Sequence, residues 1–326
     1  AVEHRAHILS QCALMNTAAI PTTFSPSLLP DLALIRIQGT DAAHFIHNQL
    51  SHDFLLIKPQ EARLAVWCTP KGRTLVSFYG FKPQADTVFL LLAADSVEFI
   101  VKRLKMFVLR SKCTVEDVSA EWQISGHIQA NGETTPADAM HSRALEADAD
   151  SAGYALSLPS VAFHSQVFSR EIRIKPAQAA SKIEVDASGL AWWHWLQVQS
   201  GIALVGAALR EAFVPQMINY ESLGGINFKK GCYPGQEVVA RSQFRGQVKR
   251  RSYLVHAAGE LAPGAEVLDA QGHSCGLVAM SAASPVGDGW AAIISVQTSS
   301  AEAGELKVGE HSLSLQDLPY ALLEDI

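Results

Sequence analysis

The chain of 326 residues lacks several features that would assign it to a broad class of protein. It contains no run of about 18 apolar residues, the length that a membrane-spanning helix needs. Its 26 basic residues are outnumbered by 32 acidic ones, which argues against a protein that coats nucleic acid without specificity. Charged residues make up only 18%, whereas apolar residues make up 48%, enough to bury a core and to rule out global disorder.

Cysteine is also scarce, and its spacing excludes two kinds of small fold. Five cysteines are an odd number, and none lies in a Cys-x-x-Cys pair. This pattern argues against a disulfide framework or a zinc ribbon and favours a reducing compartment, so we expect a cytoplasmic protein. Residues 1–26 lack the apolar centre of a signal peptide and are expected to form a loose N-terminal arm.

Hydrophobic periodicity and turn residues predict an α+β chain. After strands at 33–38, 63–68 and 73–81 and a helix at 41–50, the order β-α-β-β-α-β is expected. That order is typical of a ferredoxin-like unit. Its strands are expected at 87–93, 112–118, 122–129 and 152–158, with helices from Asp95 to about 109 and over the weakly patterned stretch 136–149.

The last quarter of the chain has a different pattern. Ser188-Gly189 precedes an apolar helix that is expected over 190 to about 200 and is ended by Gly201. Beyond it, short strands separated by Pro-Gly, Gln-Gly and Gly-Asp-Gly turns indicate a small antiparallel barrel or sandwich. These strands are expected near 252–257, 265–270, 273–282, 289–296, 305–308 and 311–318.

One stretch concentrates positive charge. Residues 228–252 hold seven basic residues and one acidic residue, a net +6, while the whole chain carries −6. A basic stretch in an acidic protein indicates contact with an anion or, equally, a solvated linker between domains.

Cys232 lies in this stretch and has the surroundings of a reactive cysteine. It follows Lys229 and Lys230, and Pro234 is expected as the first residue of a helix through 242. A helix N-terminus and neighbouring ammonium groups both favour the thiolate over the thiol. No histidine is adjacent in sequence, so a Cys-His nucleophile is not indicated. Burial as small apolar side chains is expected instead for Cys68, Cys113 and Cys275.

The same stretch resembles the signature of a known family. Residues 230–237 read Lys-Gly-Cys-Tyr-Pro-Gly-Gln-Glu, and Phe-Arg-Gly-x-x-Lys-Arg follows at 244–250. This pattern is similar to that of the YgfZ family of folate-binding proteins, which are related to the aminomethyltransferase (T-protein) of the glycine cleavage system. The resemblance extends to 35–53, 70–73, 102–112 and 213–226, and so covers most of the chain beyond residue 30.

The resemblance implies an architecture of three domains around a central folate cavity, with the cysteine motif at its mouth. These are a discontinuous folate-binding domain (27–84 and 181–245), a ferredoxin-like domain (85–180) and a C-terminal β-barrel (246–326). It also implies tetrahydrofolate or another folate derivative as cofactor, and a role in making or maintaining iron–sulfur enzymes, including the tRNA methylthiolation enzyme. Those enzymes are then partners, and 229–251 is available for transient contact with nucleic acid or another anion.

The implied site residues follow from the motif and from the chemistry of a folate. Lys230, Cys232, Gln236 and Glu237 are the implied catalytic residues. Trp193 matches the tryptophan of the family pattern Trp-x-x-Leu-x-Ile-x-x-Gly and inherits a stacking contact with the pterin, although burial of all three neighbouring tryptophans in the core is the alternative. Asn219 and Glu221 are candidates for the pterin edge, and Lys71 and Arg73 for the glutamate tail.

The chain departs at two places from the patterns that it resembles. Leu32 stands where family members often carry a second folate-contacting tryptophan. Residues 72–77 lack the acidic pair that aminomethyltransferases carry there, which argues against aminomethyl transfer because acid–base work on a folate nitrogen needs a placed titratable group. A one-carbon transferase and an RNA-binding module remain the alternatives, and turnover of a substrate stays open.

A metal site is not expected. His44, His47 and His52 have approximate helical spacing, but no fourth ligand accompanies them.

Overall fold

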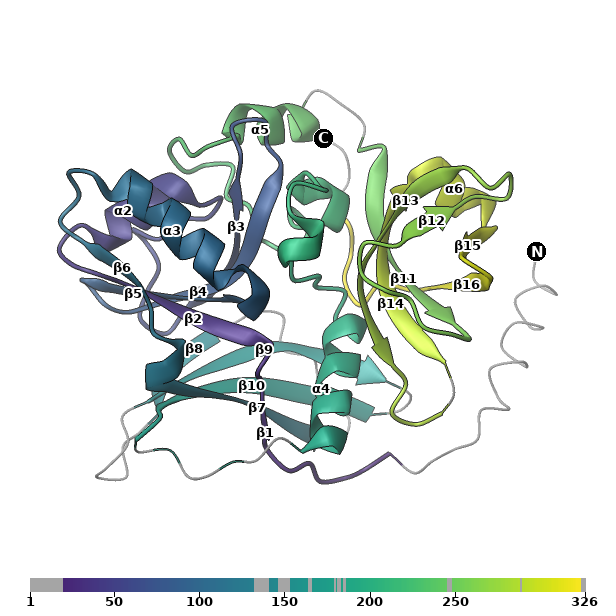
Figure 1. Cartoon of the computed structure of the whole chain (residues 1–326), viewed down its shortest axis with the longest axis horizontal. Helices are drawn as coiled ribbons and strands as arrows, with labels where there is room; N and C mark the ends of the chain where they lie inside the picture. The colour runs from purple at the N-terminus through teal and green to yellow at the C-terminus, as the bar shows by residue number, and fades with distance from the viewer. Residues whose placement is uncertain are drawn as a thin grey trace.

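The computed structural model describes residues 20–131, 141–145, 153–163, 166–178, 180, 183, 186–244, 248–287 and 289–323. Over these ranges the strands form two open five-stranded sheets and one closed six-stranded barrel, so the chain is α+β as expected. Figure 1 shows the barrel beside the two open sheets, with one helix standing between the second sheet and the barrel. No described helix is long and apolar enough to span a membrane.

The first sheet is covered by two helices on one face only. Ile35 and Leu90 point to the face that α2 and α3 cover, whereas Leu34 and Leu91 point to a core shared with the second sheet. This alternation is the period-2 pattern of strands buried on both sides. The sheet has the order β3-β4-β5-β2-β6 and is antiparallel throughout. Its elements are β2 (Leu32–Gln38), α2 (Ala42–Gln49), β3 (Ala62–Cys68), β4 (Thr74–Gln84), β5 (Thr87–Ala93), η2 (Ala94–Ser96), α3 (Val97–Val108) and β6 (Thr114–Asp117).

The second sheet is antiparallel, with the order β1-β7-β10-β9-β8, and it carries α4. Asp186 caps the N-terminus of α4 by accepting a hydrogen bond from the Ser188 N–H, and Gly201, at φ +68°, follows its end. The elements are β1 (Ser27–Leu28), η3 (Ser119–Glu121), β7 (Trp122–Asn131), β8 (His141–Leu145), β9 (Gly153–Phe163), β10 (Gln166–Pro176) and α4 (Ala187–Gln199).

The expected β-α-β-β-α-β order between 87 and 158 is wrong in two respects. Strands β5 and β6 belong to the first sheet, where each pairs antiparallel with β2, so that the two are parallel to each other and form a split β-α-β unit with α3. Strands β7 and β9 belong to the second sheet. The described part of the expected helix at 136–149 is strand β8, which pairs with β9. Pairing with a neighbouring strand outweighs the helix preference of a weakly patterned, alanine-rich stretch.

The C-terminal barrel is closed, as expected, with the order β11-β14-β13-β12-β15-β16. Its expected strands lie within a few residues of those observed. The elements are β11 (Arg250–Ala257), β12 (Glu266–Leu268), β13 (Ser274–Ala283), β14 (Trp290–Gln297), α6 (Thr298–Ala303), β15 (Leu306–Val308) and β16 (His311–Gln316).

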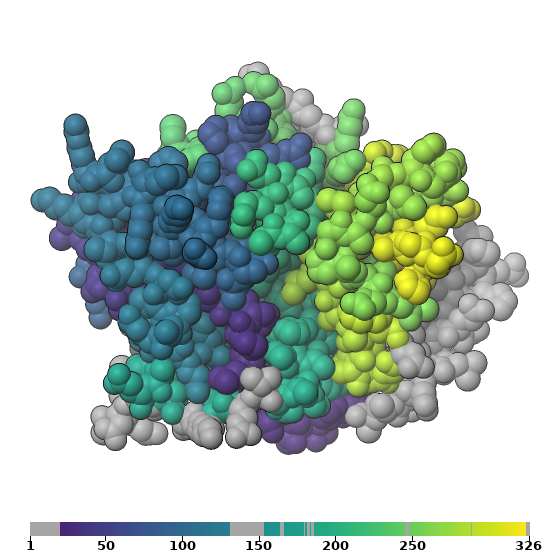
Figure 2. Space-filling model, in the orientation of Figure 1, coloured from purple at the N-terminus to yellow at the C-terminus, as the bar shows by residue number. Residues whose placement is uncertain are grey.

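Residues 200–226 join the three β-layers. Tyr220 donates a hydrogen bond to the Ala203 carbonyl, and Tyr320 donates to the carbonyl of Gly201, so the C-terminal segment closes over this part of the chain. Figure 2 shows green atoms at the surface between the blue atoms of the first sheet's helices and the yellow-green atoms of the barrel. Two short 3₁₀ helices lie here, η4 (Ala207–Leu209) and η5 (Pro215–Ile218), and α5 (Gln236–Phe244) follows.

Candidate functional site

The cysteine motif forms an exposed loop that leads into α5. Cys232 is exposed, whereas Cys68 and Cys275 are buried as expected and Cys113 is partly exposed. The helix begins at Gln236 and not at Pro234, so the expected helix start is wrong by two residues. The reason is Gly235, whose φ of +82° is outside the helical range and delays the first turn.

Gly235 also brings the loop against the hairpin between β3 and β4. A Cβ at Gly235 would lie 2.4 Å from the carbonyl oxygen of Thr69, and a Cβ at Gly72 would lie 2.8 Å from Cβ of Val238. The absence of side chains therefore allows the close approach. The hairpin turn carries Lys71 and Arg73, two of the predicted folate residues, so the structure places them beside the cysteine motif.

The side chain of Arg73 is held by a hydrogen bond within the protein, whereas that of Lys71 is exposed to solvent. The Arg73 guanidinium donates to the Ala212 carbonyl at 3.1 Å, which anchors it toward the central segment. Lys71 is exposed, so its ammonium is accessible to an anion.

Lys230 is buried and holds the end of α2. Its Nζ donates to the carbonyl oxygens of His47 and Leu50, and lies 4.6 Å from the centre of the Tyr233 ring. An ammonium group at the C-terminus of a helix satisfies carbonyls that have no helical partner. Burial lowers the pKa of Lys230 to about 8, although Asp53 and Cys232 act in the opposite direction.

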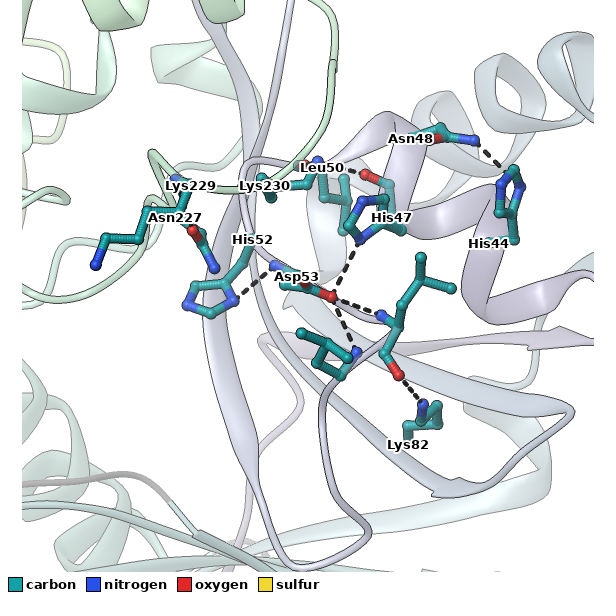
Figure 3. A network of polar contacts seen from close by, with 12 residues as sticks. His44, His47, Asn48, Leu50, His52, Asp53, Lys82, Asn227, Lys229 and Lys230 are labelled. Carbon is teal, nitrogen blue, oxygen red and sulfur yellow. Dashed lines mark hydrogen bonds and ion pairs between the residues drawn. The ribbon is translucent and has the colours of Figure 1, made fainter.

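A histidine lies next to the cysteine loop. The Nδ1 atom of His47 is 3.2 Å from Oδ1 of Asp53, and a Cβ at Gly231 would lie 3.8 Å from Nε2 of the same ring (Figure 3). The sequence argument against a Cys-His arrangement considered only residues adjacent in sequence. The histidine in fact comes from α2, far from the motif along the chain.

Gln236 and Glu237 have different surroundings. The Gln236 side chain donates weakly to the Lys230 carbonyl at 3.4 Å, which ties the start of α5 to the loop. Glu237 is exposed and pairs with Arg241 one turn later at 2.8 Å. Its carboxylate is thus engaged in a surface ion pair, a weak interaction.

Trp193 is buried in the core between α4 and the second sheet, as are Trp192 and Trp195. A Cβ at Gly126 would lie 2.6 Å from the Trp193 ring, and the Arg170 guanidinium carbon lies 5.7 Å from the ring centre. The indole therefore has β7 and a cation as neighbours.

Arg170 is a buried cation that donates hydrogen bonds to the neutral groups of Gln197 and Pro159. It donates to Oε1 of Gln197 at 2.8 Å, and Gln197 in turn donates to the Tyr79 hydroxyl and to the Ile202 carbonyl. Burial lowers the pKa of Arg170 to about 10. Within the described part of the chain, its Nε atom has no hydrogen-bond partner.

Asn219 and Glu221 lie at the junction with the barrel. The Asn219 amide donates to the Ser252 carbonyl at 2.9 Å and accepts from the Ser252 N–H at 3.1 Å. Glu221 forms an ion pair with Arg251, with Oε1 and a guanidinium nitrogen 2.5 Å apart. The other carboxylate oxygen, Oε2, is buried and has no hydrogen-bond partner among the described residues.

The predicted residues therefore fall into three groups. Lys71, Arg73, Lys230, Cys232, Gln236 and Glu237 lie around the hairpin and the cysteine loop, Asn219 and Glu221 lie at the barrel junction, and Trp193 lies against the second sheet. Sequence reasoning missed His47, Asp53, Arg170 and Arg251 as parts of these groups. His47 had been considered only as a metal ligand, and in the described part of the chain no group of three or more His, Cys, Asp or Glu residues is placed to hold a metal ion.

Comparison with known proteins gives a consistent result. No family model matches the chain. A protein of Cronobacter sakazakii named tRNA-modifying protein YgfZ is 27% identical over 330 residues, which cover 94% of this chain and 96% of that protein. A protein of the same name from an Enterobacter strain is also 27% identical, over 325 residues and the same shares of both chains.

The fold is similar to that of a solved enzyme. The glycine cleavage system aminomethyltransferase T of Bartonella henselae superposes with a TM-score of 0.62 over 97% of both chains, at 16% identity. At that identity the likeness shows the fold alone. The resemblance to the YgfZ family and the T-protein-like architecture expected from it are thus confirmed.

Proposed function

We propose that this protein is a cytoplasmic, folate-binding accessory factor that supports the synthesis or repair of iron–sulfur enzymes, including tRNA methylthiolation, through Cys232. One observation carries the proposal. The motif at 230–237 presents its cysteine to solvent while its lysine is buried and anchors the loop to α2. The relatives named as tRNA-modifying proteins, similar over 94% of the chain, support the link to tRNA modification.

In this proposal the motif residues divide the work. Cys232 is the nucleophile, because it is exposed and the other described cysteines are more shielded. Lys230 fixes the loop through two backbone carbonyls and places a positive charge close to the thiol. Gln236 ties the loop to α5, and Glu237 faces solvent, where a partner protein reaches it.

The proposed folate site is supported by a buried carboxylate oxygen of Glu221 that lacks a hydrogen-bond donor among the described residues. The edge of a pterin donates hydrogen bonds, and the buried Oε2 atom of Glu221 lacks a donor among the described residues. We assign the edge to Glu221, with Asn219 beside it, and the glutamate tail to Lys71 and Arg73. When bound, tetrahydrofolate supplies reduced ring nitrogens that carry one-carbon units.

A pterin that stacks on Trp193 would have to compete with the Arg170 guanidinium for the face of the indole ring. Because the Arg170 guanidinium lies over that ring, a pterin stacked there displaces it or shares the ring with it.

Calorimetric titration with tetrahydrofolate tests the folate assignment. Trp193→Phe keeps an aromatic face and should retain most of the affinity, whereas Trp193→Ala should lose about 1–3 kcal/mol, the scale of aromatic stacking. Trp192→Phe is the matched control, because Trp192 packs on Phe24 and Phe168 in the same helix. Equal affinities for the wild-type protein and Trp193→Ala would remove Trp193 from the site.

Complementation tests the cysteine. In cells that lack the native protein, Cys232→Ser should fail to restore tRNA methylthiolation, because serine keeps the size and polarity but not the nucleophilicity of the thiol. Full restoration by Cys232→Ser would show that the cysteine is structural and would overturn the proposal.

A further inference from the structure

We propose that His47 is the acid–base partner of Cys232 and that Asp53 is its positioning residue. The inference rests on the proposed function only in taking Cys232 as the nucleophile. The arrangement joins the last turn of α2, the turn that follows it and the cysteine loop, three segments that the polar network of Figure 3 connects.

The backbone brings the histidine to the loop. Lys230 binds the His47 and Leu50 carbonyls, which places the start of the loop against the end of α2. Gly231 comes next, and its missing Cβ would be 3.8 Å from Nε2 of His47. Cys232 is the next residue, with its Cα about 3.8 Å from that of Gly231, and in the proposed arrangement its thiol lies on the side of the loop that faces Nε2.

Asp53 fixes which ring nitrogen carries the proton. Its Oδ1 atom accepts hydrogen bonds from the backbone N–H groups of Leu55 at 2.8 Å and Leu56 at 3.0 Å. Burial acts against the charge of Asp53, but these two donors and the His47 ring together keep the pKa of its carboxyl below the usual value. A carboxylate accepts only, so Nδ1 of His47 donates to it and Nε2 keeps its lone pair toward the loop.

The charges around His47 keep the ring ready to accept a proton. Burial, followed by the positive charge of Lys230 and a smaller effect of His44, lowers the pKa of His47 below 6.5, against the opposing effect of Asp53. The ring is therefore neutral at pH 7. After proton transfer, Asp53 stabilises the imidazolium and the nearby Lys230 ammonium stabilises the thiolate.

In the proposed thiol–disulfide exchange, His47 takes up the proton of the Cys232 thiol and later releases it to the leaving thiolate. The S–H bond of Cys232 breaks, its proton passes to Nε2, and Sγ forms a bond with a sulfur atom of a disulfide on a partner. The S–S bond of that disulfide breaks, and the leaving thiolate takes the proton from Nε2, which returns the ring to the neutral form. Cys232 is thereby oxidised to a mixed disulfide and one sulfur of the partner disulfide is reduced to a thiol, so the partner disulfide is the oxidant and no other is needed. Exchange at sulfur suits an exposed thiol, because the electrophile arrives on another molecule.

The test is the pH dependence of Cys232 alkylation by iodoacetamide in the full-length protein, followed by mass spectrometry of the peptide that contains Cys232. We expect His47→Gln to lower the rate at pH 7 at least about tenfold. Asp53→Asn should lower it less, because the ring remains but its orientation is lost. His44→Gln is the matched control on the same helix, where His44 is exposed and contacts Asn48, and its rate should stay close to that of the wild type, because His44 has only the smallest effect on the His47 ring.

A second measurement needs no substitution at the buried histidine. The titration of His47, followed by NMR before and after alkylation of Cys232, should shift its midpoint, because the ring loses its thiol partner. A wild-type alkylation profile in His47→Gln, or an unchanged His47 titration after alkylation, would overturn the inference. Failure of the proposed function appears elsewhere, as full complementation by Cys232→Ser, so the two are distinguishable.

Discussion

Arg251 and Glu221 form a buried ion pair that joins the barrel to the central segment, and removing one partner should weaken the whole molecule. The Glu221 side chain is fully buried and that of Arg251 is only 8% exposed. Arg251→Met deletes the cation and, among the residues that the structure describes, leaves the Glu221 carboxylate with Ser222 as its hydrogen-bond donor. The variant therefore isolates a negative charge inside the protein.

The expected loss follows from that isolation. Breaking a buried pair by removing one partner costs about 3–5 kcal/mol, because the uncompensated charge has lost its hydration. The double variant Glu221→Gln/Arg251→Met removes both charges, so it should be more stable than the sum of the single losses predicts, by about 2 kcal/mol or more. Arg250→Met is the control, because successive strand residues point to opposite sides, and it should cost less than about 0.5 kcal/mol.

Urea unfolding followed by tryptophan fluorescence measures these losses. The six tryptophans are spread over the first sheet, the second sheet with α4, and the barrel, so a single transition in their summed fluorescence is expected if the three parts unfold together. A loss below about 1 kcal/mol for Arg251→Met, or strict additivity in the double variant, would refute the reasoning that the pair is desolvated and coupled.

Three further outcomes are expected. Gly235→Ala should destabilise the protein by more than about 1 kcal/mol in urea unfolding, because its Cβ would lie 2.4 Å from a hairpin carbonyl at φ +82°, whereas Gly272→Ala has a similar φ but open space and should cost less. Burial lowers the pKa of His52 to about 4, so the unfolded chain takes up a proton on this histidine at a higher pH than the folded protein does. The free energy of unfolding should therefore fall by up to about 3 kcal/mol as the pH drops from 6.5 to 4, and His52→Gln should lack this part of the pH dependence. Iodoacetamide at neutral pH should label Cys232 before Cys68, whose pKa burial raises to about 12, and equal labelling of the two would contradict the structure.

Elements with strong local patterns were predictable from the sequence. The strand expected at 87–93 is β5, because an apolar run of 7 residues between turns is the length of a buried strand and too short for a typical helix. Gly201 follows the end of α4 as expected, whereas the N-cap is Asp186, ahead of the expected start after Ser188-Gly189. Strand β8 was missed because its pairing with β9 is a long-range contact that no local pattern carries.

In the candidate site too, features that depend on nearby residues were predictable and those that depend on long-range contacts were not. The exposure of Cys232 agrees with its position in a glycine-rich turn, which depends on nearby residues. The positions of Lys230 and His47 depend on a contact between α2 and a loop more than 180 residues later. A contact between residues so far apart in the chain cannot be predicted from sequence spacing. Lys230 was therefore expected beside the thiol, and its hydrogen bonds to the carbonyls at the end of α2 were not expected.

The contact between Lys230 and α2 also constrains the order in which the protein matures. During synthesis, α2 and the first sheet leave the ribosome long before residue 230, so the carbonyls at the end of α2 first lack the ammonium that later satisfies them. Contacts of such high sequence separation form late in folding. Cys232 is therefore set in its final surroundings only when nearly three-quarters of the chain is made, so a half-finished protein lacks the cysteine loop in its native form.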